Sequence, residues 1–249
     1  MAGKPPHACA VHQPNLFPRL STLAKLYASD RWVVLDNVQF VRRDYQHRCR
    51  VGTPGAPETH QWLSLPVHLP DGRSTPIDRV TLADPRTARR RLEGMLTQHY
   101  GRARHWSRVR DVVHQLTDLV GSTDRLADIA LASTTAVLNL LDWPGTAVSS
   151  STFDVSQERS ARLADLTHAV GQATYLCGTG GARYLDEWPF HQRGIHVAYW
   201  QLPAAEPHSI WVDARRLTSV AAIATHGIGR VKAALETATA RSGSPSPAR

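Results

Sequence analysis

The sequence predicts an α/β protein with a central sheet that is mixed or mostly parallel, flanking helices and a helical middle insertion. Short apolar runs rich in β-branched residues alternate with segments of helical periodicity near both ends, while residues 84–143 show helical periodicity alone. A 249-residue chain that is 42% hydrophobic can bury a sizeable core. We expect one domain over residues 1–240, with 84–143 as a helical layer or lid and 241–249 as a disordered tail.

The first strand, helix and second strand are predicted close together near the start of the chain. Residues 8–13 are predicted to form a buried strand, which begins with the apolar run 8–11. Apolar positions then recur at helical spacing from Leu16 to Tyr27, with Pro18 in the first turn. Residues 31–40 form a second run with a β-branched centre. The short connection between the two runs favours a parallel pair joined by a crossover.

A hairpin and three helices are predicted next. Residues 45–51 and 61–67 alternate in polarity around a Pro/Gly turn, which is typical of a hairpin. Residues 84–143 divide into three helical pieces, and Ser122 or Thr123 is a candidate N-cap for the third. The remaining expected elements are a strand at 146–153, a helix at 156–171, strands at 174–177 and 195–200, and helices at 213–226 and 229–240.

Composition narrows the class of protein. We see neither an apolar stretch of transmembrane length nor the apolar core of a signal peptide, so we expect a soluble cytoplasmic protein without a membrane partner. Cys9, Cys49 and Cys177 are too few and too scattered for a disulfide framework, and no C-x-x-C pair suggests a structural metal. We expect no metal and no cofactor.

The formal net charge of +8 favours anionic partners such as phosphates, nucleotides, coenzyme A, an acidic carrier protein or RNA. The alternative is an arginine-rich surface without a function of its own, because most of the excess is arginine spread along the chain.

The polar residues around the first two predicted strands are the first candidate site. His12, Gln13 and Asn15 lie where a strand meets a helix, and open α/β sheets bind ligands at such strand ends. The alternative is that they only tie down the turn through backbone hydrogen bonds. Asp36 and Gln39 end the second strand, where the Asp36 carboxylate would orient His12, act as a base, or pair structurally with a nearby arginine.

Gln46, Arg48 and Arg50 share one predicted strand face. A guanidinium group beside an amide suits a carboxylate or a phosphate, although a solvated strand face would have the same pattern.

A glycine-rich turn after the strand at 174–177 is the second candidate site. Gly178, Gly180 and Gly181 follow Cys177 and precede Tyr184, and free N–H groups in such a turn would cradle an oxyanion or a phosphate. The alternative is a tight connection beside a small buried thiol.

The same segments resemble the WbqC-like protein family. Residues 12–19, His-Gln-Pro-Asn-Leu-Phe-Pro-Arg, are similar to the family's His-Gln-Pro-Asn-Tyr-x-Pro-Trp, and residues 36–40 are similar to its Asp-x-Val-Gln-Phe. Residues 45–51 resemble its Trp-Gln-Asn-Arg-Asn-x-Ile, and residues 175–185 its Tyr-Leu-Ser-Gly-x-Gly-Gly-x-x-Tyr-Leu. The departures are Cys177 in place of Ser, His47 and Cys49 in place of two Asn, and Ala221 in place of an expected Asp.

The resemblance implies a biosynthetic enzyme, because family members occur in O-antigen and natural-product gene clusters and one suggested activity is transfer of glycine onto a sugar. Our leading hypothesis is a transferase that moves an aminoacyl or acyl group onto an amine or hydroxyl of a sugar or secondary metabolite. The small-molecule acceptor would meet a donor such as an acidic acyl carrier protein, a coenzyme A thioester or an aminoacyl-tRNA.

The hypothesis gives each candidate residue a role. His12 is the general base and Asp36 orients it, while Cys177 is a candidate for a thioester intermediate. The expected binding residues are Gln13, Asn15, Gln39, Gln46, Arg48, Gly178, Gly180, Gly181 and Tyr184.

Two other functional hypotheses stay open. A nucleotidyl transferase-like enzyme would use the His-x-x-Asn turn for phosphate binding, although Pro14 removes one N–H group there. A binding module without catalysis would recruit an acidic carrier protein or RNA to a basic surface, which contains Arg86, Arg89, Arg90, Arg91, Arg102, Arg104, Arg108 and Arg110.

Overall fold

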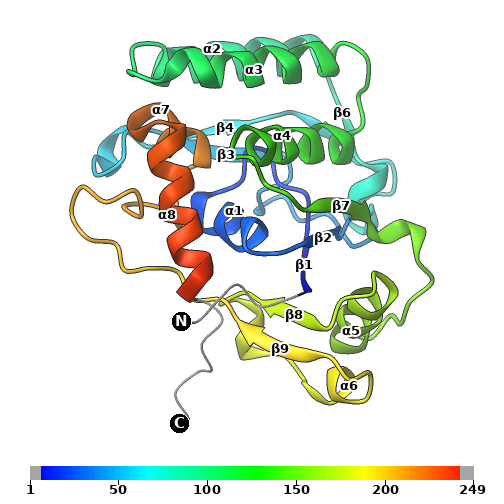
Figure 1. Ribbon diagram of the computed structural model, residues 1–249. Coiled ribbons are helices and arrows are strands. Elements are labelled where there is room, and N and C mark those ends of the chain that lie inside the picture. The colour runs from blue at the N-terminus through cyan, green and yellow to red at the C-terminus, as the bar shows by residue number, and fades with distance from the viewer. Residues whose placement is uncertain (1–6, 242–249) are drawn as a thin grey trace.

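A five-stranded parallel sheet forms the centre of the structure, which is a computed structural model that describes residues 7–241 (Figure 1). The strand order is β7-β2-β1-β8-β9, and every neighbouring pair runs parallel. The predicted α/β class is therefore confirmed, and the sheet is entirely parallel rather than mixed. Its strands are β1 (Ala8–His12), β2 (Arg31–Val34), β7 (Thr146–Ser149), β8 (Thr174–Cys177) and β9 (His196–Tyr199).

Both faces of this sheet are buried, which explains why its strands are apolar throughout. Cys9 and Val11 of β1 pack in one apolar cluster with residues of α5 (Arg159–Ala169) and α6 (Trp188–His191). Ala10, on the opposite face of β1, belongs to the larger core. That core includes α1 (Leu20–Tyr27), α7 (Ser219–His226) and α8 (Ile228–Arg241).

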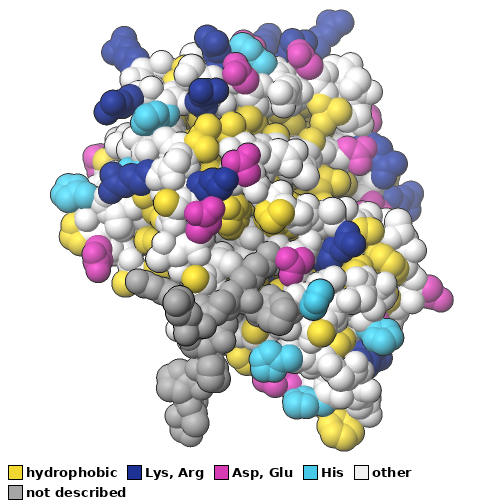
Figure 2. Space-filling model, viewed as in Figure 1, with side chains coloured by type: hydrophobic (Ala, Val, Ile, Leu, Met, Phe, Trp, Pro, Cys, Tyr) yellow, Lys and Arg dark blue, Asp and Glu magenta, His cyan; other side chains and the backbone are white. Residues whose placement is uncertain are grey.

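The chain between β2 and β7 forms a separate layer above the sheet (Figure 1). The predicted hairpin is present as antiparallel β3 (Arg48–Val51) and β4 (Gln61–Ser64), and the three predicted helices are α2 (Pro85–Tyr100), α3 (Trp106–Val120) and α4 (Leu126–Leu140). A second short antiparallel pair, β5 (Val67–His68) and β6 (Thr81–Leu82), links the hairpin to the helices. Figure 2 shows Lys and Arg side chains gathered over α2 and α3, with Asp and Glu side chains among them.

Several predicted boundaries were wrong, each for a local reason. The second strand ends at Val34 because Leu35 makes the last N–H bond to β1, at His12 O, and Asp36 then binds the end of β7. Helix α1 begins after Pro18, since Arg19 is still extended with a ψ of 148°. The residue that caps α4 is Arg125, not Ser122 or Thr123.

The C-terminal prediction was partly correct. The helix expected at 213–226 begins only at Ser219, and the helix expected at 229–240 is α8, which includes Arg241. The rest of the expected disordered tail, 242–249, lies outside the described residues. Within residues 7–241, no helix is both long enough and apolar enough to span a bilayer.

Helix α2 is tied to the hairpin by a hydroxyl group, which leads to a prediction. The buried Tyr100 hydroxyl accepts a 3.0 Å hydrogen bond from Gly52 N and donates one of 3.3 Å to Gly52 O. Tyr100→Phe leaves both groups unpaired in an apolar site, so we expect the free energy of unfolding to fall by about 1–3 kcal/mol in urea titrations. Tyr184→Phe, which removes a hydroxyl from an exposed ring, is the matched control, and an equal loss there would contradict the explanation.

Candidate functional site

A cavity of about 830 Å³ lies at the carboxyl ends of β1, the central strand of the sheet, and of its neighbour β8. After β1 the chain crosses to β2 on one side, whereas the chain after β8 crosses to β9 on the other side. The two connections therefore lead away from each other and leave a crevice between them. Both predicted turns line it: His12 and Gln13 from the end of β1, and Gly178, Gly180 and Gly181 from the turn after β8. The structure therefore brings the two candidate regions together.

His12 lines this cavity with a neutral ring. Its Nδ1 lies 2.8 Å from the Gln13 carbonyl oxygen, so a proton assigned to Nδ1 donates to that oxygen and leaves Nε2 as an acceptor. Burial, with a smaller contribution from the Lys25 cation, lowers the pKa of His12 to about 3. The imidazole is therefore uncharged at neutral pH, and it is a weak base.

Gln13 is held in position by a buried partner. Its Oε1 accepts a 2.6 Å hydrogen bond from Nε2 of Gln46, whose side chain is fully buried. Gln46 itself does not line the cavity. It reaches the site only through Gln13.

Asn15 is buried and lies outside the cavity lining. Its carbonyl oxygen accepts hydrogen bonds from the hydroxyl groups of Ser133 and Thr134 on α4, at 3.2 and 2.9 Å. The geometry matches the alternative reading for this residue, in which it ties down the turn.

Asp36 and Gln39 lie away from the cavity lining as well. The Asp36 carboxylate accepts hydrogen bonds from Ser149 Oγ, from Ser150 Oγ at 3.0 Å and from Ser151 N at 3.1 Å, and thus joins the ends of β2 and β7. Because these donors hold it, Asp36 makes no hydrogen bond to His12 in residues 7–241. Gln39 donates from Nε2 to Arg73 O at 2.7 Å.

The predicted face forms only in part, because β3 begins at Arg48 and therefore carries Arg48 and Arg50 without Gln46. The guanidinium carbons of Arg48 and Arg50 lie 4.1 and 4.6 Å from the centre of the Trp62 ring. Arg48 also donates to backbone carbonyls of Arg43 and Asp44. Neither arginine lines the cavity.

The glycine turn presents backbone N–H groups to the cavity. Gly181 N and Ala182 N donate back to Gly178 O at 3.0 and 3.2 Å, whereas within residues 7–241 the N–H groups of Thr179 and Gly180 make no hydrogen bond. Thr179 and Gly180 both line the cavity. Unused N–H groups at such a turn favour an anion.

Cys177 and Tyr184, at the two ends of this turn, do not line the cavity. The Cys177 side chain is fully buried, and burial raises the pKa of its thiol to about 11. It is therefore a neutral thiol at physiological pH. Tyr184 is 68% exposed, with the Arg159 guanidinium carbon 5.7 Å from the centre of its ring.

Lys25 is a cavity residue that the sequence reasoning missed. It lies on α1, is 7% exposed, and its Nζ donates to Val11 O at 3.4 Å. Burial lowers its pKa to about 8. The signal in the sequence is a single charged side chain within an apolar helix, at a position where a further apolar residue would have sufficed for packing.

The cavity lining is strongly cationic, which the sequence also did not reveal. Besides Lys25 it contains four arginines, and Asp44 is the one acidic side chain among the lining residues. In the described part of the chain none of these cations forms an ion pair with a carboxylate, and a cation without a counter-ion in a cleft attracts an anionic ligand. The four arginines are Arg19, Arg159, Arg162 and Arg215.

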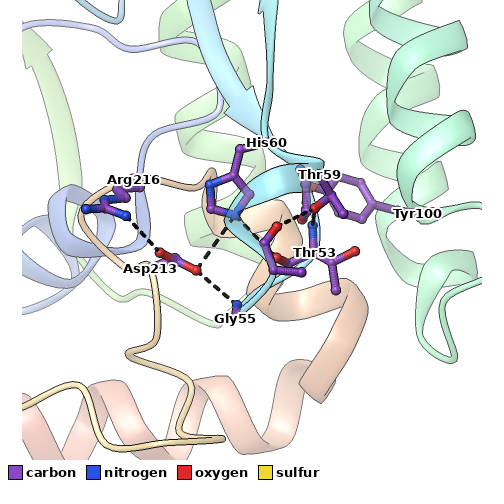
Figure 3. A network of polar contacts seen from close by, with 9 residues as sticks. Thr53, Gly55, Thr59, His60, Tyr100, Asp213 and Arg216 are labelled. Carbon is purple, nitrogen blue, oxygen red and sulfur yellow. Dashed lines mark hydrogen bonds and ion pairs between the residues drawn. The ribbon is translucent and has the colours of Figure 1, made fainter.

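A polar network around Asp213 holds the turn that precedes Arg215 (Figure 3). Asp213 Oδ2 accepts a 2.9 Å hydrogen bond from Gly55 N in the hairpin turn and lies 3.7 Å from His60 Nε2. Asp213 has a left-handed φ of 56°, and Arg215 O then accepts a 3.2 Å hydrogen bond from Arg19 Nη1. The network therefore fixes the turn that carries one cavity arginine and supports another.

The comparisons with known proteins agree with these motifs. A model of the WbqC-like protein family matches residues 13–209. The chain belongs to this family. It is similar to "Uncharacterized protein Rv1507c" of Mycobacterium tuberculosis (strain ATCC 25618 / H37Rv), with 24% identity over 197 residues that cover 77% of this chain and 80% of that protein. No solved structure matches the chain.

Two segments that resemble WbqC-like motifs, the His-Gln turn and the glycine turn, line the cavity together. The segment that resembles the family's Asp-x-Val-Gln-Phe contributes Val38 to the cavity lining, while its Asp36 carboxylate binds the serines that follow β7.

The neutral state of His12 predicts a loss of stability in acid. The unfolded chain binds a proton at this position below about pH 6.5, while the folded protein does so only near pH 3. Stability is therefore retained above pH 6.5 and is lost as the pH falls from 6.5 toward 3. Urea titrations of His12→Gln should show a slope shallower by up to about 1.4 kcal/mol per pH unit in this window.

His68→Gln, which removes an exposed histidine, is the control for this experiment and should follow the wild-type curve. Some acid sensitivity remains in His12→Gln, because burial also lowers the pKa of His47 to about 4. Identical slopes for wild type and His12→Gln would contradict the neutral imidazole.

Asp213 supplies a second test of the site's construction. Asp213→Ala removes the acceptor for Gly55 N and places alanine, which disfavours the left-handed region, at this left-handed φ. We therefore expect the free energy of unfolding to fall by about 1–3 kcal/mol. Asp213→Asn keeps an acceptor and tolerates this backbone conformation, so it should lose less. Equal losses in the two variants would show that the network does not set the stability of the turn.

Proposed function

We propose that this WbqC-like protein is a transferase that moves an acyl or aminoacyl group from a phosphate-bearing donor onto an amine or hydroxyl of a sugar or secondary metabolite. The observation that carries the proposal is the composition of the cavity: the His-Gln turn and the glycine turn share it with five cationic side chains and one carboxylate.

The cationic lining supports a phosphate-bearing donor. Guanidinium groups bind phosphates through paired hydrogen bonds, and the lining arginines Arg159 and Arg215 have no carboxylate partner within residues 7–241. A volume of about 830 Å³ lies within the usual range of small-molecule sites. Among the donor classes predicted from the sequence, a coenzyme A thioester combines phosphates with an activated acyl group in one small molecule.

The glycine turn and the His-Gln turn suit the two ends of an acyl transfer. The unused N–H groups of Thr179 and Gly180 are placed to stabilise the oxyanion that forms when a nucleophile attacks a thioester carbonyl. Nε2 of His12, which can accept a hydrogen bond, and the side-chain amide of Gln13 would hold the N–H or O–H group of the acceptor substrate. Cys177 has no part in this scheme, because its thiol is buried and protonated.

A nucleotidyl transferase is the second candidate, since a cationic cavity at a central strand end also suits a nucleoside triphosphate. The same reaction mixtures test it, because release of pyrophosphate would identify this activity. The binding-module reading has weaker support. On the basic face of α2 and α3, Arg89 and Arg110 already pair with Asp118 and Asp111.

The test is a transfer assay by mass spectrometry, with a panel of acyl and aminoacyl coenzyme A thioesters and amino sugars as acceptors. We expect product with at least one pair. Arg159→Ala and Arg215→Ala should each weaken coenzyme A binding about tenfold or more, because each removes a charge-assisted contact of about 1.5–3 kcal/mol. Arg90→Ala, on α2 and outside this cavity, is the matched control.

Pantetheine, which lacks the nucleotide phosphates, is the matched ligand. Affinity for coenzyme A should fall steeply with salt, whereas affinity for pantetheine should change little. If coenzyme A and pantetheine bind equally well, and if no thioester yields product, the proposed donor class is wrong.

A further inference from the structure

Lys25 is chemically distinct among the cations of this protein. The chain has 29 Lys and Arg residues, of which three are lysines, Lys4, Lys25 and Lys232. Lys4 lies outside the described residues, and Lys232 forms a surface ion pair with Asp142 at 2.6 Å. An arginine side chain stays protonated at any pH a protein tolerates, whereas a lysine can release its proton. The cation buried at the bottom of the arginine-lined cavity is thus one that can become neutral.

The Lys25 side chain lies between the His-Gln turn and the glycine turn. Its Nζ bonds to Val11 O, one residue before His12, and it would lie 3.6 Å from a Cβ placed on Gly178. A side chain at Gly178 would therefore meet the amine. Lys25 also lines the cavity, so a ligand held between the His-Gln turn and the glycine turn would lie against its side chain.

The groups around the amine leave it without a counter-ion. The titratable groups facing it are Cys9 and His12 from β1 and Cys177 from β8. Burial keeps both thiols protonated and the imidazole neutral, and in the described part of the chain Lys25 pairs with no carboxylate. Burial favours the uncharged amine, and no carboxylate among its described neighbours opposes this effect.

We propose that Lys25 is the catalytic residue that accepts the proton of the attacking amine or hydroxyl during acyl transfer, which is an inference that rests on the proposed function. The acceptor's nitrogen or oxygen forms a bond to the thioester carbonyl carbon, and its proton passes to neutral Nζ of Lys25. The carbon–sulfur bond then breaks, and the ammonium group returns the proton to the departing thiolate. The amine is neutral again, and no further reactant is needed.

Lys25 suits this step better than His12 does. A pKa of about 8 leaves about one tenth of the amine neutral at pH 7 and still allows it to hold the proton, whereas a pKa of about 3 lets the imidazole hold almost none. His12 therefore orients the acceptor, and Lys25 removes its proton.

The first test uses unmodified protein and no substrate. Competitive labelling with acetic anhydride over pH 6–11, read by mass spectrometry, gives the titration of each lysine. Lys25 should become half reactive near pH 8, while Lys232, whose pKa is raised by its bond to Asp142, should do so above pH 10.5. Coenzyme A should protect Lys25 and leave Lys232 unprotected. A Lys25 that titrates together with Lys232, or that coenzyme A does not protect, overturns the proposal.

The second test uses two variants and the transfer assay. Lys25→Met removes the amine with similar volume, and Lys25→Arg keeps a charge that does not titrate. Both should lower kcat by about 10²–10⁴-fold with little change in KM, and both should lose the rise in kcat/KM that wild type shows as the pH increases through 8. Lys232→Met is the control and should keep wild-type rates. Wild-type rates or an unchanged pH profile in Lys25→Arg would overturn the proposal.

The two tests separate the two ideas. If wild-type protein transfers nothing from any thioester while labelling still shows a ligand-protected Lys25 that titrates near pH 8, the acyl-transfer function fails and the role of Lys25 in that reaction fails with it. If transfer occurs and only the labelling or the variants disagree, the function stands and the assignment of Lys25 is wrong.

Discussion

The position of β1 between β2 and β8 is the constraint on which the site depends. Because β1 runs parallel to both neighbours, the turns that follow β1 and β8 leave the sheet at the same edge. Segments far apart in the sequence, the His-Gln turn and the glycine turn, are thereby brought to one cavity. The strands are short and apolar because both faces of the sheet are covered. Polar side chains are left to collect at the strand ends, where several of them line the cavity.

Burial without a counter-ion then sets the protonation state of two of these polar groups. Lys25 and His12 lie within the same desolvated region, and each is shifted toward its neutral form. The arginines around them remain charged, because guanidinium groups do not titrate in this range. The cavity thus combines the fixed positive charge of its arginines with a neutral imidazole and an amine that can release its proton, an arrangement suited to binding an anion and moving a proton.

The sequence predicted the parts of the fold that local pattern controls. The strand at 174–177 and the three helices between 84 and 143 follow from apolar periodicity and were confirmed. The end of β2 was wrong because a tertiary contact, Asp36 with the serines after β7, ends the strand before its apolar pattern does. Lys25 was missed for a related reason: helical periodicity identifies an apolar face, but only the fold shows that this face borders a cavity.

The hydroxyl groups of α4 limit what can move when a ligand arrives. Ser133 receives the N–H of Phe17, which has a left-handed φ of 41°, and with Thr134 it also holds the carbonyl of Asn15. No residue of the layer formed by α2, α3 and α4 lines the cavity. Helix α4 therefore supports the N-terminal turn from outside the cavity, and moving this helix would break the hydrogen bonds that hold the turn.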